Sequence, residues 1–567
     1  MRAARLLTIA SATLLIAVTS SALGDLTAQV PGAVALNGTV NSEEEGKMEG
    51  VVVNARRDGA NFTVSVVSDA QGKYSFPRTH LEPGKYALTI RAVGYDLSDP
   101  GLVDVPAGEA ASRDLALKKT RDLASQLSSL EWVMSVPGTT EQKDKLVYQA
   151  ASCAYCHTLE RVMKSKHTAE RLVQAMHRMQ TYYYDGTAVN KDNSRGRGQK
   201  NMPAQVAAAE KNPNWGPIPG VSKNELADYL ATVNLSGART TWPYELKTLP
   251  RPKGQATRVI ITQYDMPRAG TVAHDLDVDS KGIPWYTDES RMFVGKMDPK
   301  TGKFTEYPLP PVPPGDLPGA RDIQVDQDDN LWFPRRIAGG ATVLTKFDPK
   351  TEHVSTLEGA GGQFMALGPD GKIWAGWKRV EPKAMKIEAS YSWSNSPNLP
   401  PGQHGQYVDL TVVNSKGNPY APDFRGSHII GIDATTGEAK FWPTPTRNSM
   451  PRRGRMDAQD RFWFAEYTGD MIGMFDTRTE KFQEWPVRKY TTPYAASVPD
   501  KNGYAYATSN MSERLLRLDP KTGEIIEYQI PTDFDSKKIA YDPTTRGVTL
   551  WMANTRNARI TKVEPLD

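Results

Sequence analysis

Two cysteines occur in the 567 residues, and they lie three positions apart in the segment ASCAYCHTLE, residues 151–160. Cys153 and Cys156 are followed directly by His157. Two thiols one helical turn apart can reach the two vinyl groups of one porphyrin, and the adjacent imidazole can then bind its iron. Cys-x-x-Cys-His is the attachment signature of c-type haem. The sequence therefore predicts one covalent haem c, attached through Cys153 and Cys156, with His157 as an axial ligand of the iron.

Two other uses of such a cysteine pair are open at this point. A redox-active dithiol would be expected in a thioredoxin-like βαβ context, whereas the surrounding residues have helical spacing. A zinc site would need a fourth ligand and usually a second Cys/His pair. Haem attachment is favoured because it accounts for both cysteines and for the histidine.

The elements that must position this motif are helical. Apolar residues recur at helical spacing in 120–135, 140–157, 168–184 and 222–235. Thr168 and Ser222 are expected N-caps, and Glu225 completes the pattern of a capping box with Ser222. We expect a small helical domain over residues 119–237, built around the cysteine pair.

This domain resembles a monohaem class I cytochrome c. The matching features are the segment CAYCH, the pair Met202 and Pro203 in KNMPAQ, and a final helix with Leu226, Tyr229 and Leu230. In that family a loop methionine before the last helix ligates the iron, so the resemblance implies Met202 as the second axial ligand. His167 and His177 are the alternative ligands. The long insertion TYYYDGTAVNKDNSRGRG departs from the shortest members of the family.

Residues 1–24 have the composition of a secretory signal peptide. Arg2 and Arg5 precede an apolar run, and small residues lie before Asp25. A retained membrane anchor is the alternative, and we expect no other membrane span after signal removal. Loss of the two arginines lowers the formal net charge from +4 to +2, which argues against nucleic acid as a partner. The expected location is the periplasm or another exported site.

Residues 33–118 alternate apolar and polar side chains, with turns at DAQG and EPGK, as in a small all-β domain. Its expected core residues are Tyr74, Phe76, Tyr86, Leu88 and Ile90. Nearly the whole segment resembles the carboxypeptidase regulatory-like domain, a transthyretin-like β-sandwich, through GTV (38–40), SDAQGKYSF and LEPGKYALTIRAVGY. The resemblance implies an accessory or adhesive module without chemistry of its own. His80 is expected to be a solvated turn residue.

Residues 256–567 contain a repeat of four strands, which is the pattern of a propeller blade. Six complete units begin near residues 271, 319, 361, 404, 449 and 493, and a seventh near 537 lacks its outer strand. The segment VIITQYDMP (259–267) resembles the missing strand and would close the ring from the other end of the repeat region. We predict seven blades, with six or eight as alternatives because the third and fourth units are irregular.

The repeats resemble the virginiamycin B lyase (streptogramin lyase) propeller family over roughly residues 270–565. The resemblance is carried by DNLWF, GKIWAGW, RFWFAEYTGDMIGMFD and the DPKTG turns. In the lyase, glutamates hold a magnesium ion and a nearby histidine is the general base. Glu466 matches such a glutamate, but residue 468 is a threonine, so lyase activity is not expected.

Polar residues at predicted strand ends could line a central funnel of the propeller. The candidates are His274, Arg321, Arg335, Arg336, His428, Arg453 and Glu466, and neighbouring polar residues include Asp275, Asp322, Asp423, Arg425 and Arg452. Several arginines at equivalent repeat positions would suit a small anionic or hydroxylated ligand.

The sequence thus predicts a multidomain, mainly β protein with an N-terminal β-sandwich, a small all-α cytochrome c domain and a C-terminal seven-bladed β-propeller. The favoured function is an exported c-type cytochrome that transfers electrons to or from a redox partner protein, while the propeller binds a substrate or a partner protein. In an alternative, the propeller is a catalytic module, oxidoreductase or lyase-like, with the haem as electron acceptor. A further alternative is a docking platform at the cell surface.

Overall fold

The computed structural model describes residues 33–154, 157–184, 211, 213, 222–237, 239–268, 270–289, 291–313, 316–337, 342–362, 364–392 and 410–566. The predicted signal peptide, Cys156 and Met202 lie outside these residues. The backbones of Cys153 and Arg336 are described and their side chains are not. In the described part of the chain, no helix is both long enough and apolar enough to cross a membrane.

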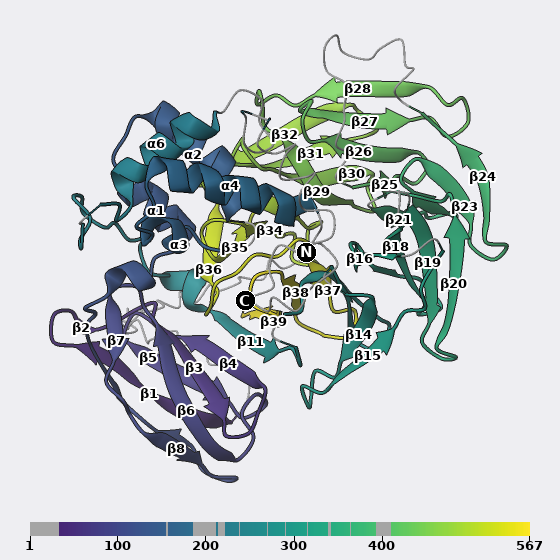
Figure 1. Ribbon diagram of the computed structural model, residues 1–567. Coiled ribbons are helices and arrows are strands. Elements are labelled where there is room, and N and C mark those ends of the chain that lie inside the picture. The colour runs from purple at the N-terminus through teal and green to yellow at the C-terminus, as the bar shows by residue number, and fades with distance from the viewer. Residues whose placement is uncertain are drawn as a thin grey trace, which may run out of the picture.

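The N-terminal region is a β-sandwich, as predicted (Figure 1). Its strands are β1 (Val34–Ser42), β2 (Gly46–Lys47), β3 (Val52–Arg57), β4 (Phe62–Val67), β5 (Lys73–Pro77), β6 (Gly84–Arg91), β7 (Tyr95–Leu97), β8 (Leu102–Val105), β9 (Ala111–Ser112) and β10 (Leu115–Lys119). Alternate residues of β5 and β6 face inward, so Tyr74, Phe76, Tyr86 and Leu88 are buried between the sheets. The fifth predicted core residue, Ile90, is partly buried against the same cluster.

Five α-helices are described between the sandwich and the C-terminal region. They are α1 (Ser129–Ser135), α2 (Thr140–Cys153), α3 (Glu160–Met163), α4 (Ala169–Tyr184) and α6 (Lys223–Val233), and a short 3-10 turn, η1 (Leu123–Ser125), precedes them. The single helix predicted over 120–135 is wrong. Ser128 has an extended backbone, and its hydroxyl accepts from the Glu131 N–H while the Glu131 carboxylate accepts from Ser128, so a capping box starts α1 there. Ser222 caps α6 as predicted, because its Oγ accepts from the Glu225 N–H at 3.4 Å.

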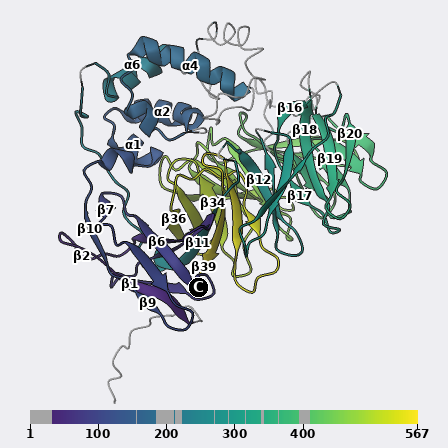
Figure 2. The ribbon, with the colours of Figure 1, turned by 60° about the horizontal axis from the view of Figure 1, so that its bottom comes forward.

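The helices share one hydrophobic cluster with a residue of the C-terminal region. Leu130, Trp132, Leu146, Leu226 and other helical side chains pack together with Met511, which is fully buried. Helix α6 contacts both α2 and α4. In both views the helices lie beside the sandwich on one side of the C-terminal region (Figures 1 and 2). The helices therefore share a core with that region.

The C-terminal region is a propeller-like array of antiparallel sheets, seven of them in the described part of the chain. The first sheet contains β12 (Ala273–Val278), β13 (Pro284–Asp288), β14 (Phe293–Met297) and β15 (Phe304–Pro308). The second contains β16 (Asp316–Ala320), β17 (Gln324–Val325), β18 (Leu331–Ile337), β19 (Thr342–Asp348) and β20 (His353–Glu358). The third contains β21 (Met365–Leu367), β22 (Ile373–Ala375), β23 (Lys378–Glu381) and β24 (Lys386–Ser390). The fourth sheet contains β25 (Val412–Val413), β26 (Pro419–Asp423), β27 (His428–Ile432) and β28 (Ala439–Pro443). The fifth contains β29 (Pro451–Met456), β30 (Arg461–Glu466), β31 (Met471–Asp476) and β32 (Lys481–Pro486). The sixth contains β33 (Pro493–Ala496), β34 (Ala505–Ser509), β35 (Arg514–Leu518) and β36 (Ile525–Gln529).

An aspartate–tryptophan contact recurs in several of the sheets. In the first sheet Asp279 lies in the turn between the first two strands, where one carboxylate oxygen accepts from two backbone N–H groups of that turn. Its other oxygen accepts from the indole N–H of Trp285 at 3.0 Å. Asp326 with Trp332, and Asp457 with Trp463, repeat the contact at the same sequence spacing. The turn is thereby tied to the second strand, and the buried indole satisfies its one donor.

The seventh sheet is completed from both ends of the repeat region, as predicted. Strands β37 (Ala540–Tyr541), β38 (Leu550–Asn554) and β39 (Arg559–Pro565) supply three strands, and β11 (Val259–Asp265), which follows the 3-10 turn η3 (Gly254–Thr257), supplies the fourth. β11 pairs antiparallel with β39 over its full length. This closure leaves β39 without a free edge.

The sandwich continues this seventh sheet, a connection that the sequence did not predict. The far edge of β11 pairs antiparallel with β4, with Tyr264 opposite Phe62, and β3, β6 and β8 extend the sheet to eight strands. The expectation that His80 is solvated is wrong, because its Nε2 lies 3.0 Å from the Glu564 carboxylate on β39. The sandwich and the ring are therefore joined by backbone hydrogen bonds.

Candidate functional site

The environment of His157 fits an axial ligand of a metal centre. His157 follows α2 by four residues, and its Nδ1 lies 2.8 Å from the Thr158 carbonyl oxygen. Because a carbonyl oxygen only accepts, Nδ1 carries the proton and Nε2 keeps its lone pair. Burial lowers the pKa of His157 from 6.5, although the Thr158 carbonyl acts to raise it. The neutral imidazole with a free Nε2 is the form that binds metal ions.

The segment that follows His157 is fixed against the helices. The Leu159 N–H donates to the Ser129 hydroxyl at 3.1 Å, and the Trp242 indole N–H donates to the Met163 carbonyl at 3.2 Å. Of the two alternative ligands, His167 lies in the loop before α4 and His177 lies within α4. The position of His157 is thus set by α1 and by the chain beyond α3.

Ion pairs join different sheets of the ring. Arg453 on β29 places Nη1 2.6 Å from the Asp275 carboxylate on β12 and donates to the Lys537 carbonyl at 2.9 Å. All three side chains are buried. Burial acts to raise the pKa of Asp275, but the charge of Arg453 and the neighbouring His274 hold it below its usual range. A charged pair at this depth is compensated within the protein.

Two lysines extend this network. Lys537 Nζ lies 2.7 Å from both carboxylate oxygens of Asp535, and burial lowers the Lys537 pKa to about 8 although Asp535 acts to raise it. Lys538 Nζ lies 3.0 Å from Asp277 and 3.9 Å from Asp322, and it donates to the Ile323 carbonyl. The charged side chains of this network therefore lie in pairs of opposite charge.

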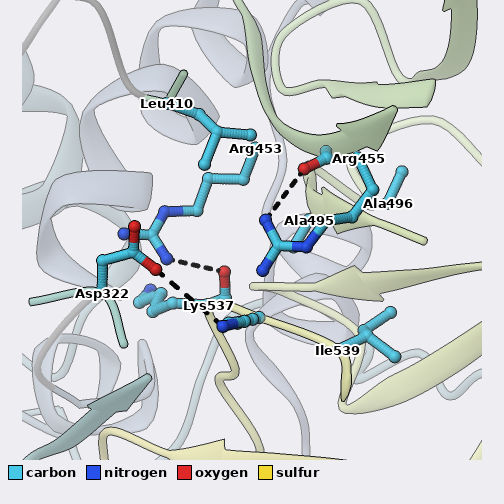
Figure 3. A pocket seen from close by; sticks show the side chains of 10 residues that line it. Asp322, Leu410, Arg453, Arg455, Ala495, Ala496, Lys537 and Ile539 are labelled. Carbon is cyan, nitrogen blue, oxygen red and sulfur yellow. Dashed lines mark hydrogen bonds and ion pairs between the residues drawn. The ribbon is translucent and has the colours of Figure 1, made fainter. Parts of the chain in front are cut away.

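A small hollow remains beside these pairs. It is lined by Asp322, Leu410, Arg453, Gly454, Arg455, Ala495, Ala496, Lys537, Lys538 and Ile539 (Figure 3). Its free space is about that of one water molecule. A larger ligand would have to displace side chains in order to reach this part of the axis.

The predicted funnel residues are brought together only in part. His274 lies beside Asp275, with 3.4 Å between its Nδ1 and the carboxylate, and so joins Arg453. Arg321 donates to Glu289 at 2.6 Å, and the fully buried Arg335 donates to the Pro310 carbonyl at 2.7 Å. His428 begins β27, where Asp423 is its opposite residue on β26. Arg336 is placed on β18 by its backbone alone.

Glu466, at the end of β30, lies apart from the axial pairs. Its side chain is fully buried, and burial, followed by the charge of Glu484, raises its pKa to about 9. A Cβ at Gly473 would come within 2.7 Å of the Glu466 carboxyl, so glycine at that position makes room for it. Glu466 is therefore a neutral acid at pH 7. Thr468 donates to the Asn448 carbonyl and offers no general base beside it.

Sequence reasoning missed an aromatic group around Arg452. The guanidinium carbon lies 3.7 Å from the ring centre of Tyr494, 4.6 Å from that of Phe424 and 5.0 Å from that of Tyr467, and Nη2 donates to the Tyr494 hydroxyl at 2.8 Å. Phe424 and Tyr467 each follow directly after the second strand of their sheets. That shared repeat position was a signal that could have revealed the group. Cation–π contacts of this kind hold Arg452 in one orientation.

In the part of the chain that the structure describes, no three His, Cys, Asp or Glu side chains gather as ligands for a metal ion.

Comparisons with known proteins found one matching family model and a number of similar solved structures. Residues 35–118 match the sequence model of the carboxypeptidase regulatory-like domain family. Among solved structures, a streptogramin B lyase is 17% identical with a TM-score of 0.46 and covers 55% of this chain and 99% of its own. Virginiamycin B lyase from Staphylococcus aureus is 19% identical with a TM-score of 0.46 and covers 54% of this chain and 99% of its own. A chain of the Mitotic Checkpoint Complex is 12% identical with a TM-score of 0.41 and covers 58% of this chain and 98% of its own.

No curated protein matches the chain. The description of residues 256–567 as propeller-like therefore rests on their own seven sheets and on the closure by β11. Residues 35–118 are a carboxypeptidase regulatory-like domain.

Proposed function

We propose that the protein is an exported c-type cytochrome that transfers electrons through one covalent haem c. Cys153 and Cys156 would attach the haem, and His157 and Met202 would be the axial ligands of its iron. The proposal rests on one observation: the single Cys-x-x-Cys-His motif of the chain begins at the last residue of α2 and ends on a histidine whose Nε2 is left free for a metal. In this proposal the helical region is a class I cytochrome c domain.

Neighbouring residues would hold His157 in the form that binds a metal ion. The Thr158 carbonyl fixes the tautomer of His157, and burial disfavours the charged form of the imidazole. The Ser129 hydroxyl holds the chain two residues beyond it. Haem, when bound, supplies one-electron chemistry, and the axial ligands set its reduction potential. A methionine ligand would give a higher potential than a second histidine.

The ring is proposed to bind a redox partner protein or a small anionic or hydroxylated substrate. Because Arg453 and Arg321 are already paired with carboxylates, a docked partner protein fits the geometry better than an anion bound by these two arginines. The electrons would then pass between the haem and a partner held on the ring.

The proposal is tested by expressing the full chain with a c-type haem maturation system. We expect a pyridine haemochrome band of c type and haem that stays on the denatured polypeptide. Cys153→Ser with Cys156→Ser should abolish the covalent haem. A wild-type protein without covalent haem would contradict the proposal.

The axial methionine needs its own variant. Met202→Ala should remove the sulfur-to-iron absorption at the red edge of the spectrum and keep the covalent haem. His167→Ala and His177→Ala are the matched controls, and we expect both to retain this absorption. A wild-type protein that lacks this absorption would contradict the methionine ligand, and the histidine variant with an altered haem spectrum would then identify the second axial ligand.

A further inference from the structure

A chain of hydrogen bonds runs from the seventh sheet of the ring to the segment that contains His157. Arg556 Nη2, from the turn after β38, donates to the Asn510 carbonyl at 2.6 Å. The next residue, Met511, accepts from the Leu130 N–H of α1 at 2.8 Å. Ser129, adjacent to Leu130, accepts from the Leu159 N–H. Arg556 and His157 are thus tied to the same junction between the ring and the helices.

Arg556 is a buried cation at this junction. Its side chain is 1% exposed, and Nη1 lies 2.7 Å from the Asp533 carboxylate while Nε lies 3.8 Å from the Asp535 carboxylate. Asp533 is 31% exposed, so it is the part of this group that meets solvent. Arg556 and Asp533 therefore lie on the ring side of the contact that also holds the segment of His157.

The same group continues to the ring axis. Asp535 pairs with Lys537, whose backbone carbonyl accepts from Arg453. Four charged side chains, Asp533, Arg556, Asp535 and Lys537, thus form one connected set with equal numbers of each sign. Removal of one of them leaves a net charge in a region of low dielectric, where it acts over a longer range than at the surface.

We propose that Arg556, a residue of the ring, raises the reduction potential of the haem at His157 and that Asp533 lowers it. The inference rests on the proposed function. Oxidised haem carries one more positive charge than reduced haem, so a buried cation nearby disfavours the oxidised form and a carboxylate favours it. The ring is in this way part of the haem environment, and its sequence tunes the electron carrier.

The test is spectroelectrochemical titration of the haem-loaded full chain. Arg556→Gln should lower the midpoint potential, and Asp533→Asn should raise it. Arg556→Lys keeps the charge and should leave the potential close to that of the wild type. Arg379→Gln is a control at a partly exposed ion pair of the third sheet, in which Arg379 lies 2.8 Å from Asp370. It should leave the potential unchanged.

The outcomes separate the inference from the proposed function. A wild-type protein without haem c overturns the proposed function. Variants that hold haem and show unchanged potentials, or shifts of the same sign for Arg556→Gln and Asp533→Asn, overturn the inference alone. If Arg556→Gln does not fold, Asp533→Asn decides, because its side chain is partly exposed and its replacement leaves no buried anion. A raised potential in that variant supports the inference, and an unchanged or lowered one overturns it.

Discussion

The sandwich and the helices are attached to the ring in physically different ways. The sandwich is joined through a backbone ladder between β4 and β11, with side-chain contacts such as Arg56 with Asp265 at 2.5 Å. The helices are joined through the cluster around Met511 and a few polar contacts. A ladder inside an eight-stranded sheet opens only as a unit, whereas a packed cluster can loosen side chain by side chain. We therefore expect the sandwich and the ring to unfold together and the helices to detach more easily.

The largest effect on stability is expected from a proline inside the ladder between β4 and β11. Val64 on β4 is buried and has partners on both sides, Thr262 and Ala55. Val64→Pro removes a ladder donor and should lower the free energy of unfolding by at least about 4 kcal/mol in urea denaturation, including the lost side chain. Val64→Ala keeps the backbone donor and should cost only about 2 kcal/mol. Equal losses in the two variants would show that the ladder contributes little.

The second variant acts on the helical attachment. Met511→Ala empties a fully buried position between the helices and the ring, and it should cost about 3 kcal/mol. We expect limited proteolysis to cut within the helices while the sandwich and the ring remain intact. Met511→Leu conserves volume and should cost less than about 1.5 kcal/mol. Cleavage of the sandwich at the same rate would contradict the proposed difference between the two attachments.

A third prediction concerns the pH dependence of stability, at a carboxyl group near the contact between the ring and the helices. Asp470 accepts from the backbone N–H groups of Tyr490 and Thr492, next to the contacts with α2. Burial raises its pKa from 3.8 to about 6, although these two bonds act to lower it. Its folded pKa is raised, so its contribution to stability is fully present below about pH 3.8 and is lost as the pH rises through about 6.

Measured against Asp470→Asn, the wild type should therefore lose on the order of 2 kcal/mol between pH 4 and 6, and nothing further above pH 7. The exposed Asp328→Asn is the control and should follow the wild type. A stability difference between wild type and Asp470→Asn that is flat from pH 4 to 7 would refute this assignment.

The smallest expected effect is that of one hydroxyl. Tyr490 donates to the Asp144 carboxylate of α2 at 2.9 Å, and Lys489 lies 3.1 Å from the same carboxylate. Tyr490→Phe should cost about 1 kcal/mol, because a partly exposed hydrogen bond is replaced by water. Tyr504→Phe, on the sixth sheet away from the helices, should cost less. A larger loss for Tyr504→Phe would mean that the contact with α2 has no part in the attachment.

The repeat pattern made the ring predictable, but it gave no information about how the sandwich attaches to the ring. The seven units and the closing role of 259–267 could be predicted, because each repeat states its own strand order and the closing strand resembles its equivalents. The second partner of β11 could not be predicted, because edge pairing depends on backbone donors that every residue carries. The contact of His80 with Glu564 joins residues 484 positions apart and likewise has no local signal.

The candidate functional site could likewise be predicted only in part. The repeats predicted Arg321, Arg335 and Arg453 at strand ends, but only Arg321 directly follows a strand, whereas Arg335 and Arg453 lie within β18 and β29. Their partners could not be predicted. The carboxylate that pairs with Arg453 lies 178 positions earlier in the chain. A capping box at Ser128 and Glu131 was visible as S-x-x-E, and the helix predicted over 120–135 ran through it. The tautomer of His157 depends on a backbone carbonyl, and no residue type encodes that contact.

The double pairing of β11 also sets an order of folding. Its contact with β39 closes a loop of roughly three hundred residues, whereas its contact with β4 spans about two hundred, and both carry the entropy of long-range closure. The sandwich precedes the ring in the chain, so it offers the β4 edge as a template before β39 exists. We expect β11 to be immobilised on that edge first, and the ring to close last on a strand that is already in place.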